Sequence, residues 1–178
     1  RTCLLMKSSI SFNQPEMLKR QLQNLLLVSL IAVASICQAG NQKEEPLSRS
    51  VRTMMQKSIS DLAAPRLMFA SETEGRAWLD EMSLRLERRL PDSVYREDFL
   101  RSVHYEATRA GLDPQLVLVL IQVESCFKKY AVSNVGARGY MQVMPFWLTS
   151  IGHPAQNLFH FRLTFRYGCT ILRHYCDL

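Results

Sequence analysis

A nearly unbroken apolar run constrains the fold of this 178-residue chain more than any other feature. In the stretch LDPQLVLVLIQVES, residues 112–125, Gln122 is the only polar residue between positions 116 and 123. Asp113 is a favourable helix N-cap and Pro114 suits the first helical position, so the run is predicted as a helix rather than as a buried strand. A helix that is apolar on nearly all sides belongs in the middle of a domain. At this length the chain is expected to form about one domain.

Three other stretches are also predicted as helices. Ser71 followed by Glu74 forms a capping-box pattern, and the apolar residues after it have helical spacing until Pro91 stops the run: Trp78, Leu79, Met82, Leu86 and Leu90. The next stretch ends at Gly111, a favourable residue just past a helix, and its apolar positions are Val94, Phe99, Val103 and Ala107. A last helix is predicted to begin near Thr164. The fold class is therefore predicted as mainly α.

The N-terminal part of the chain is predicted to lie outside the folded domain. Residues 17–39 have the order of a secretory signal peptide: two basic residues, an apolar run over 25–37, and Ala39 before the cleavage site. This run is shorter than the about 20 residues of a membrane span, so we predict no stable membrane span after cleavage. Residues 1–16 are predicted to be an upstream extension. Residues 40–70, which contain two prolines, are predicted to be a linker with at most short helices.

The net charge and the arrangement of His and Cys residues indicate which partners and metals the chain is expected to bind. Residues 40–178 contain 18 Lys and Arg against 15 Asp and Glu, and this net charge of +3 does not favour a nucleic-acid partner. The four histidines are scattered and neither a CxxC nor an HExxH pattern occurs, so no metal is predicted. Cys169 and Cys176 lie about 10 Å apart on the predicted last helix, too far to bond to each other. A disulfide of Cys126 with either Cys169 or Cys176 is possible, and the sequence does not indicate which of the two pairs forms.

Glu124 stands alone at the end of the apolar helix. The next acidic residue along the chain is Asp177, although the sequence has 16 Asp and Glu in total. Partial burial and the negative end of the helix dipole both disfavour an ionised carboxyl. The pKa of Glu124 is therefore predicted to be raised toward the range of a general acid, and a solvent-exposed Glu at a helix end is the alternative.

The residues from Glu124 onward resemble the catalytic motif of the soluble lytic transglycosylase family, whose members act on peptidoglycan. The matching positions are Glu124, Ser125, Phe127, Ala131, Ser133, Gly136, Ala137, Gly139, Met141, Gln142, Met144 and Pro145. The later segments NLF (157–159) and RYGCTIL (166–172) are also similar to this family. The resemblance covers about 112–178, with weaker support from Ser71, and it implies a lysozyme-like helical domain over 71–178.

This resemblance implies an enzyme that acts on peptidoglycan glycan strands with one catalytic carboxylate, Glu124, and no cofactor. The carboxyl protonates the oxygen between N-acetylmuramic acid and N-acetylglucosamine, and then takes a proton from the muramic C6 hydroxyl, which closes onto C1 as a 1,6-anhydro end. The substrate's acetamido group stabilises the cationic intermediate. Most glycosidases need two carboxylates, so the acid-free stretch agrees with this mechanism. Asp113 is interpreted as a helix cap and Glu106 as a surface residue.

The candidate substrate-binding residues are Ser125, Gly136, Gly139, Met141 and Gln142. Ser125 either binds Glu124 or the substrate, or caps the helix end. Gly136 and Gly139 allow tight turns beside a sugar, and the Gln142 amide suits sugar hydroxyls because it both donates and accepts. Met141 borders the cleft in the family but has the spacing of a core residue.

Aromatic and basic residues near the motif have two interpretations each. The rings of Tyr140, Phe146 and Trp147 either present a flat apolar face to a sugar ring or pack in the core. The basic side chains of Lys128, Lys129 and Arg138 either attract the acidic stem peptides of peptidoglycan or belong to a solvated loop without such a role.

The sequence departs from the family at several points. Cys126 fills a variable motif position, His160 stands where relatives often have Asp, and Thr164, which can still cap a helix, stands where they often have Asn. The sequence also stops at Leu178, before the further helices and the Tyr-Asn motif of the family, so the domain is expected to be incomplete at its C-terminus. We predict a lytic transglycosylase exported to the periplasm or cell envelope of a bacterium. The alternatives are an inactive peptidoglycan-binding remnant and a hydrolytic muramidase.

Overall fold

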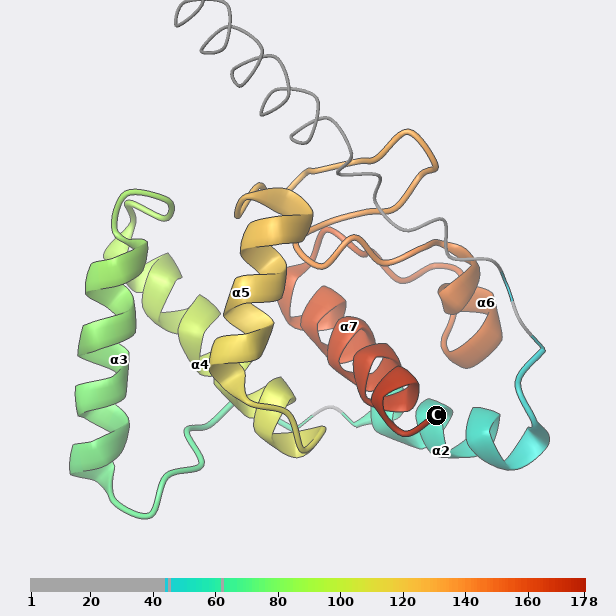
Figure 1. Cartoon of the computed structure of the whole chain (residues 1–178), viewed down its shortest axis with the longest axis horizontal. Helices are drawn as coiled ribbons and strands as arrows, with labels where there is room; N and C mark the ends of the chain where they lie inside the picture. The colour runs from blue at the N-terminus through green and yellow to red at the C-terminus, as the bar shows by residue number, and fades with distance from the viewer. Residues whose placement is uncertain (1–43, 45, 62) are drawn as a thin grey trace, which may run out of the picture. The chain divides into compact units, whose positions relative to one another are not determined.

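The computed structural model describes residues 44, 46–61 and 63–178, and the predicted extension and signal peptide lie outside this part of the chain. Over these residues the chain forms six helices, accompanied by the isolated β-bridges Val132–Arg138 and Arg138–Val143. The helices are α2 (Arg49–Ser60), α3 (Glu72–Leu86), α4 (Ser93–Arg109), α5 (Pro114–Ser125), α6 (Phe146–Ile151) and α7 (Phe161–Cys176), as Figure 1 shows. The predicted mainly α fold class is confirmed.

Helices α3 and α5 begin where the sequence predicts. The Ser71 hydroxyl accepts the backbone N–H of Glu74 at 3.2 Å, and the Asp113 carboxylate accepts that of Gln115 at 2.8 Å. Each bond satisfies one of the N–H groups that a helix start leaves without a partner. Helix α4 is followed by Gly111 in the left-handed region, with φ of +69°, as expected of a residue past a helix end.

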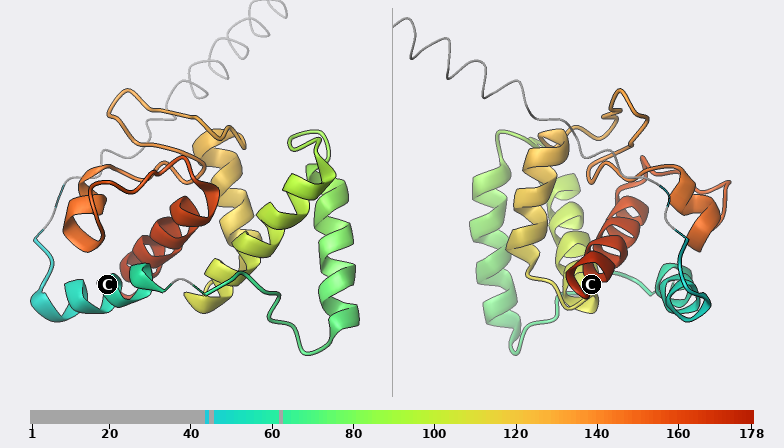
Figure 2. Two further views of the ribbon diagram at one scale, coloured as in Figure 1. Left: turned by 180° about the vertical axis from the view of Figure 1, so that it is seen from behind. Right: turned by 45° about the vertical axis from the view of Figure 1, so that its right-hand side comes forward.

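The core is built around α4, which packs against α3, α5 and α7 (Figure 2). The Phe99 ring is fully buried and meets the rings of Tyr140 and Phe165 edge-on, at centroid distances of 5.0 and 4.9 Å. The predicted core positions Phe99, Val103 and Ala107 are confirmed. Val94, by contrast, is 78 % exposed, and its predicted core position is wrong. Five residues turn a helix by about 140°, so Val94 faces away from Phe99.

Glu106 is a buried residue, which corrects the expectation that it lies on the surface. It is 1 % exposed, and its two carboxylate oxygens accept hydrogen bonds from Arg166 at 3.0 Å and from Arg109 at 2.7 Å. Arg109 also donates to the Ser58 carbonyl at 2.9 Å. A buried carboxylate is tolerated when both of its oxygens are paired in this way. The network therefore ties α4 to α7 and to α2.

Helix α2 lies in the segment expected to be a linker, so that expectation needs correction. Its 12 residues pack against α6 and α7, and Met55 and Ile59 are buried in the core. These two side chains are four residues apart and share one face of the helix. Two boundaries also differ from the pattern: α3 ends at Leu86, before the buried Leu90, and α7 begins at Phe161.

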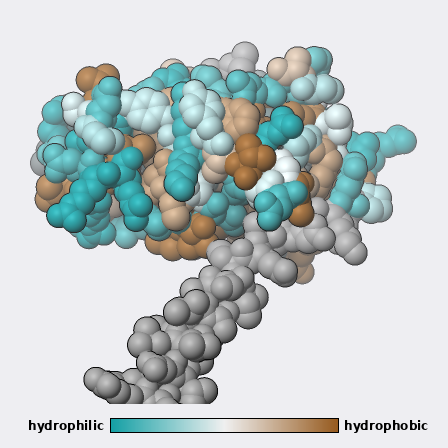
Figure 3. Space-filling view, turned by 90° about the horizontal axis from the view of Figure 1, so that it is seen from above, coloured by the Kyte–Doolittle hydropathy of each residue, from teal (hydrophilic) through white to brown (hydrophobic). Residues whose placement is uncertain are grey.

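Helix α5 buries only one of its faces among the described residues, although it was expected to be buried on nearly all sides. Val117 and Ile121 are fully buried toward α4, whereas Leu116, Val119 and Val123 are at least half exposed. Figure 3 looks onto the end of the domain where α5 stops, and apolar residues there form separate brown areas among polar ones. In the described part of the chain, no helix has both the length and the apolar character needed to cross a membrane.

Candidate active site

Glu124 lies in the last turn of α5 and is half-buried. Among the described residues its carboxyl has no hydrogen-bond or ion-pair partner. Burial raises the pKa of Glu124 above the ordinary value of a glutamic acid, as the sequence predicts. The C-terminal end of the α5 dipole acts in the same direction, because its partial negative charge disfavours a carboxylate. The group therefore has the character of a general acid that can also accept a proton.

Two residues in the left-handed region follow Ser125, the last residue of α5, and end the helix one residue after Glu124. Cys126 and Phe127 have φ of +50° and +60°, which is uncommon for residues other than glycine. The Phe127 side chain is buried and its ring lies 6.0 Å from that of Phe99 in the core. The turn is therefore held by core packing, and it starts the loop that carries the rest of the motif.

Ser125 is buried beside Glu124 and uses its hydroxyl inside the helix. Its Oγ donates to the Ile121 carbonyl at 3.0 Å, and the residue is 6 % exposed. Of the two roles considered for Ser125, this bond favours support of the helix end.

Gly136 and Gly139 were expected to allow tight turns, and both have positive φ, +89° and +75°. A Cβ on Gly139 would lie 2.4 Å from the Leu158 carbonyl oxygen, so only glycine lets the two backbones approach this closely. A Cβ on Gly136 would meet no heavy atom within 4 Å. Gly136 is thus required by its conformation, and Gly139 by its conformation and its packing.

Gln142 fixes the loop with its amide nitrogen. Nε2 donates to the Gly139 carbonyl at 2.9 Å and to the Ala131 carbonyl at 3.2 Å, and the residue is 8 % exposed. Its amide oxygen makes no hydrogen bond within the described residues and stays available as an acceptor. Met141, in contrast, packs in the core, where a Cβ on Gly168 of α7 would lie 2.4 Å from its sulfur.

The aromatic candidates Tyr140 and Trp147 are core residues, with exposures of 2 % and 3 %, while Phe146 is half-buried. The Tyr140 hydroxyl is hydrogen-bonded to that of Tyr95 at 2.9 Å, and burial raises the pKa of Tyr140. The sequence did not single out Tyr95 or Tyr130, but the Lys129 ammonium lies 5.8 Å from the ring centroid of Tyr95 and 5.3 Å from that of Tyr130. The position of Tyr130 inside the motif was the available signal.

The two other acids considered for a second catalytic role are both engaged elsewhere. Glu106 is enclosed by its arginine partners in the core. Asp113 caps α5 at the end opposite Glu124, about 16 Å away along the helix axis. The interpretation of Asp113 as a helix cap is confirmed.

The structure shows the state of three cysteines and the positions of the residues that depart from the family pattern. Cys126, Cys169 and Cys176 are all free, so neither of the disulfides considered forms. Thr164 does not cap α7, because the helix begins earlier. It is fully buried, and its hydroxyl finds no hydrogen-bond partner in the described part of the chain. His160 precedes α7 without a capping side-chain bond. No group of three or more metal-ligand side chains gathers within the described residues.

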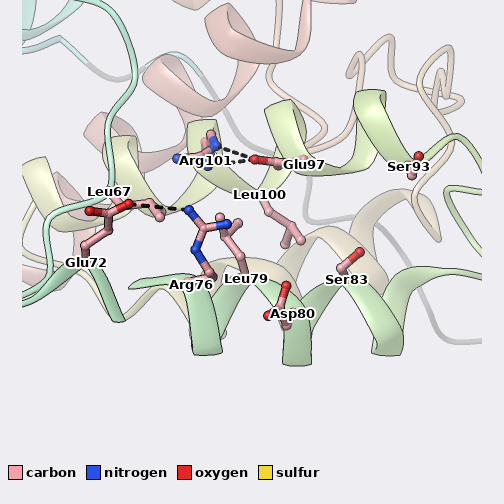
Figure 4. A pocket seen from close by; sticks show the side chains of 10 residues that line it. All are labelled: Leu67, Glu72, Arg76, Leu79, Asp80, Ser83, Ser93, Glu97, Leu100 and Arg101. Carbon is pink, nitrogen blue, oxygen red and sulfur yellow. Dashed lines mark hydrogen bonds and ion pairs between the residues drawn. The ribbon is translucent and has the colours of Figure 1, made fainter. Parts of the chain in front are cut away.

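Two of the cavities formed by the described residues lie away from the motif residues. One, of about 200 Å³ between α3 and α4, is lined by the ion pairs Arg76–Glu72 and Arg101–Glu97 (Figure 4). The other, of about 620 Å³, lies between α2 and the end of α7. Neither includes Glu124 or a predicted substrate-binding residue. The candidate site is therefore identified by the chemistry of its side chains and not by cavity size.

Comparison with known proteins places this motif in a family. The profile of the family described as "Transglycosylase SLT domain" matches residues 101–177. The chain is 44 % identical over 52 residues to a membrane-bound lytic murein transglycosylase C of Actinobacillus pleuropneumoniae serotype 5b (strain L20), covering 29 % of this chain and 14 % of the relative. It is 40 % identical over 53 residues to proteins with the same name in Mannheimia succiniciproducens and Histophilus somni (strain 2336), covering 30 % of this chain and 15 % of each relative.

The matched region therefore spans about one seventh of the length of these relatives. No solved structure matches the chain significantly. The family profile nevertheless covers α5, Glu124, the loop after it and α7, which are the elements that carry the motif. Residues 101–177 therefore match the transglycosylase SLT domain family, in agreement with the motif resemblance.

Proposed function

We propose that this chain is a peptidoglycan lytic transglycosylase that cleaves the β-1,4 bond between N-acetylmuramic acid and N-acetylglucosamine without water. The observation that carries the proposal is the Glu124 carboxyl. It is half-buried, it has no hydrogen-bond or ion-pair partner among the described residues, and its pKa is raised; it also stands at the acidic position of the motif that resembles the transglycosylase SLT domain. A carboxyl of this kind suits both proton transfers of the reaction.

In the proposed mechanism Glu124 first donates its proton to the glycosidic oxygen while the bond from that oxygen to muramic C1 breaks. The positive charge that develops at C1 is stabilised by the acetamido group of the same sugar. The Glu124 carboxylate then takes the proton of the C6 hydroxyl, whose oxygen bonds to C1 and closes the 1,6-anhydro ring. Glu124 ends protonated, as it began, and no second carboxylate takes part. The engagement of Glu106 and Asp113 elsewhere supports this single-acid route.

The proposed roles of the neighbouring residues follow from their contacts. The free oxygen of the Gln142 amide would accept a hydrogen bond from a sugar hydroxyl, while its nitrogen holds the loop. Gly136 and Gly139 would keep the loop backbone close enough to line the sugar site. We assign Ser125 and Met141 supporting roles, because their side chains contact the helix and the core.

We also propose that the chain acts in the cell envelope after export. Residues 17–39 have the pattern of a secretory signal peptide, and the relatives named above are called membrane-bound. Peptidoglycan lies outside the cytoplasmic membrane, so an enzyme acting on it has to be exported.

Digestion of intact peptidoglycan sacculi, followed by mass spectrometry of the products, tests the proposal. Muropeptides with 1,6-anhydro ends are expected from the wild-type chain. Glu124→Gln is expected to abolish product formation with its circular dichroism spectrum unchanged, because the amide has nearly the size of the acid. Asp113→Asn is the matched control, since asparagine also caps helices, and it should keep full activity. Reducing ends would indicate a hydrolase and unchanged sacculi an inactive remnant, and either result contradicts the proposal.

A further inference from the structure

A lysine ammonium lies between two aromatic rings on the loop that follows Glu124. Lys129 Nζ is 5.8 Å from the ring centroid of Tyr95 and 5.3 Å from that of Tyr130. The Tyr130 ring is in turn 5.7 Å from the ring of Phe159, at an interplanar angle of 54°. We call Lys129, Tyr130 and Phe159 the loop platform. Its members come from two loops that are 29 positions apart in the sequence.

The loop platform is held in place from both sides. The Ala131 carbonyl, next to Tyr130, accepts hydrogen bonds from the Gly139 N–H at 3.0 Å and from the Gln142 amide at 3.2 Å. On the other loop, the Phe159 N–H donates to the Asn157 side chain at 2.9 Å. A surface fixed before binding loses little conformational entropy when a ligand arrives.

Tyr95, the second ring beside Lys129, is fixed as well. Its hydroxyl is hydrogen-bonded to the Tyr140 hydroxyl, and its ring meets that of Phe161 edge-on at 5.4 Å. The lysine therefore lies against a rigid wall and is half-buried.

The loop platform has unused binding capacity. Tyr130 is 70 % exposed, so its ring is accessible to a ligand. Lys129 has no carboxylate partner within the described residues, and the sequence contains no acid from position 125 to 176. A partly desolvated ammonium gains most from an anion, and the described residues supply none here.

We propose that the loop platform binds the muramyl part of the glycan, with a sugar ring against Tyr130 and a carboxylate of the muramyl residue paired with Lys129. This inference rests on the proposed function and names its substrate class: glycan whose muramyl residues carry a carboxylate. That carboxylate comes from the stem peptide, or from the lactyl group where the peptide has been removed. Two short turns connect Glu124 to the platform, through the bonds Lys128 N–H to Ser125 C=O and Ala131 N–H to Lys128 C=O.

Binding measurements on full-length chains carrying Glu124→Gln test the inference without turnover. Calorimetry is done with three soluble probes: a peptide-bearing muramyl tetrasaccharide, its peptide-free form, and chitotetraose, which has no carboxylate. Lys129→Met is expected to raise the Kd of the carboxylate-bearing probes about tenfold, and that of chitotetraose less than about twofold. A response to only one muramyl probe identifies the carboxylate source. Lys128→Met is the matched control, because Lys128 is exposed and touches no ring, and it should leave all three Kd values within about twofold.

Tyr130→Ala provides the second arm. It removes the sugar-stacking face and is expected to raise the Kd of all three probes about three- to tenfold, with no preference for charge. If Lys129→Met and Lys128→Met change the Kd of the muramyl probes equally, the proposed binding role of the loop platform is refuted. If the wild-type chain still forms anhydro products in that case, the proposed function survives. Absence of glycan binding in every chain, together with unchanged sacculi, overturns both.

Discussion

The substitution Gly139→Ala tests how the loop after Glu124 is held against the rest of the domain. The added Cβ would lie 2.4 Å from the Leu158 carbonyl oxygen and 3.3 Å from the Thr164 hydroxyl. The first is a backbone atom, and the second belongs to a fully buried residue. Neither can swing aside as the end of an exposed side chain would, so the loop itself has to move.

The expected loss of stability has two parts. Placing alanine in the left-handed region at φ of +75° costs about 1–2 kcal/mol. Forcing an extra methyl group into a packed contact costs about 1–3 kcal/mol more. The free energy of unfolding should therefore fall by about 2–5 kcal/mol. Gly136→Ala is the matched control, because its φ is also positive but no heavy atom lies within 4 Å of the added Cβ. It should lose only the first part.

Urea denaturation followed by far-UV circular dichroism measures both variants. The unfolding free energy of a small domain falls with urea concentration with a typical slope, the m-value. With such an m-value, unchanged by the substitution, Gly139→Ala should lower the urea midpoint by about 1 M or more. Gly136→Ala should lower it by clearly less. Equal midpoints for the two variants would refute the close approach of the Gly139 and Leu158 backbones.

The remaining predictions concern Glu124 and helix α2. Because burial raises the pKa of Glu124 in the folded chain, the folded state binds more protons than the unfolded state once the pH passes the ordinary value of 4.5. The wild-type chain should therefore lose stability relative to Glu124→Gln as the pH rises from 4.5 through the raised pKa. Urea denaturation of both chains at a series of pH values across this range measures the difference. The opposite trend would contradict the burial of the carboxyl. Met55→Ala should cost about 2–5 kcal/mol in the same assay, because Met55 is 5 % exposed in the core. Met54→Ala, at a residue 71 % exposed, should stay within about 0.5 kcal/mol, and equal losses would show that α2 is not packed on the domain.

Local signals in the sequence predicted the elements that carry the site. Helix α5 begins at the Asp113–Pro114 pair because a cap and a proline act within one turn, and such rules need no knowledge of the rest of the fold. The raised pKa of Glu124 could be predicted for the same reason, from a helix end and an apolar neighbourhood. The tight turns expected at Gly136 and Gly139 rest on residue type alone, and both glycines have positive φ.

Features that depend on contacts between distant parts of the chain could not be predicted. Glu106 has the sequence environment of a surface residue, and its buried carboxylate is paired both with Arg109 nearby and with Arg166 of α7, 60 positions later. The burial of Met55 similarly depends on where α2 packs. The meeting of Tyr130 with Phe159 depends on the backbone approach at Gly139, which periodicity does not encode.

The end of α5 explains how Glu124 keeps a raised pKa although a lysine follows five residues later. A cation paired with the carboxyl would stabilise its charged form and lower the pKa. The left-handed residues Cys126 and Phe127 turn the chain sharply, and Lys129 then lies against the rings of Tyr95 and Tyr130. Its ammonium makes no ion pair with Glu124, so burial decides the pKa of the carboxyl. The same turn thus leaves the pKa of Glu124 raised and the lysine available for an anion from the ligand, which couples the proposed chemistry to the proposed recognition of the muramyl residue.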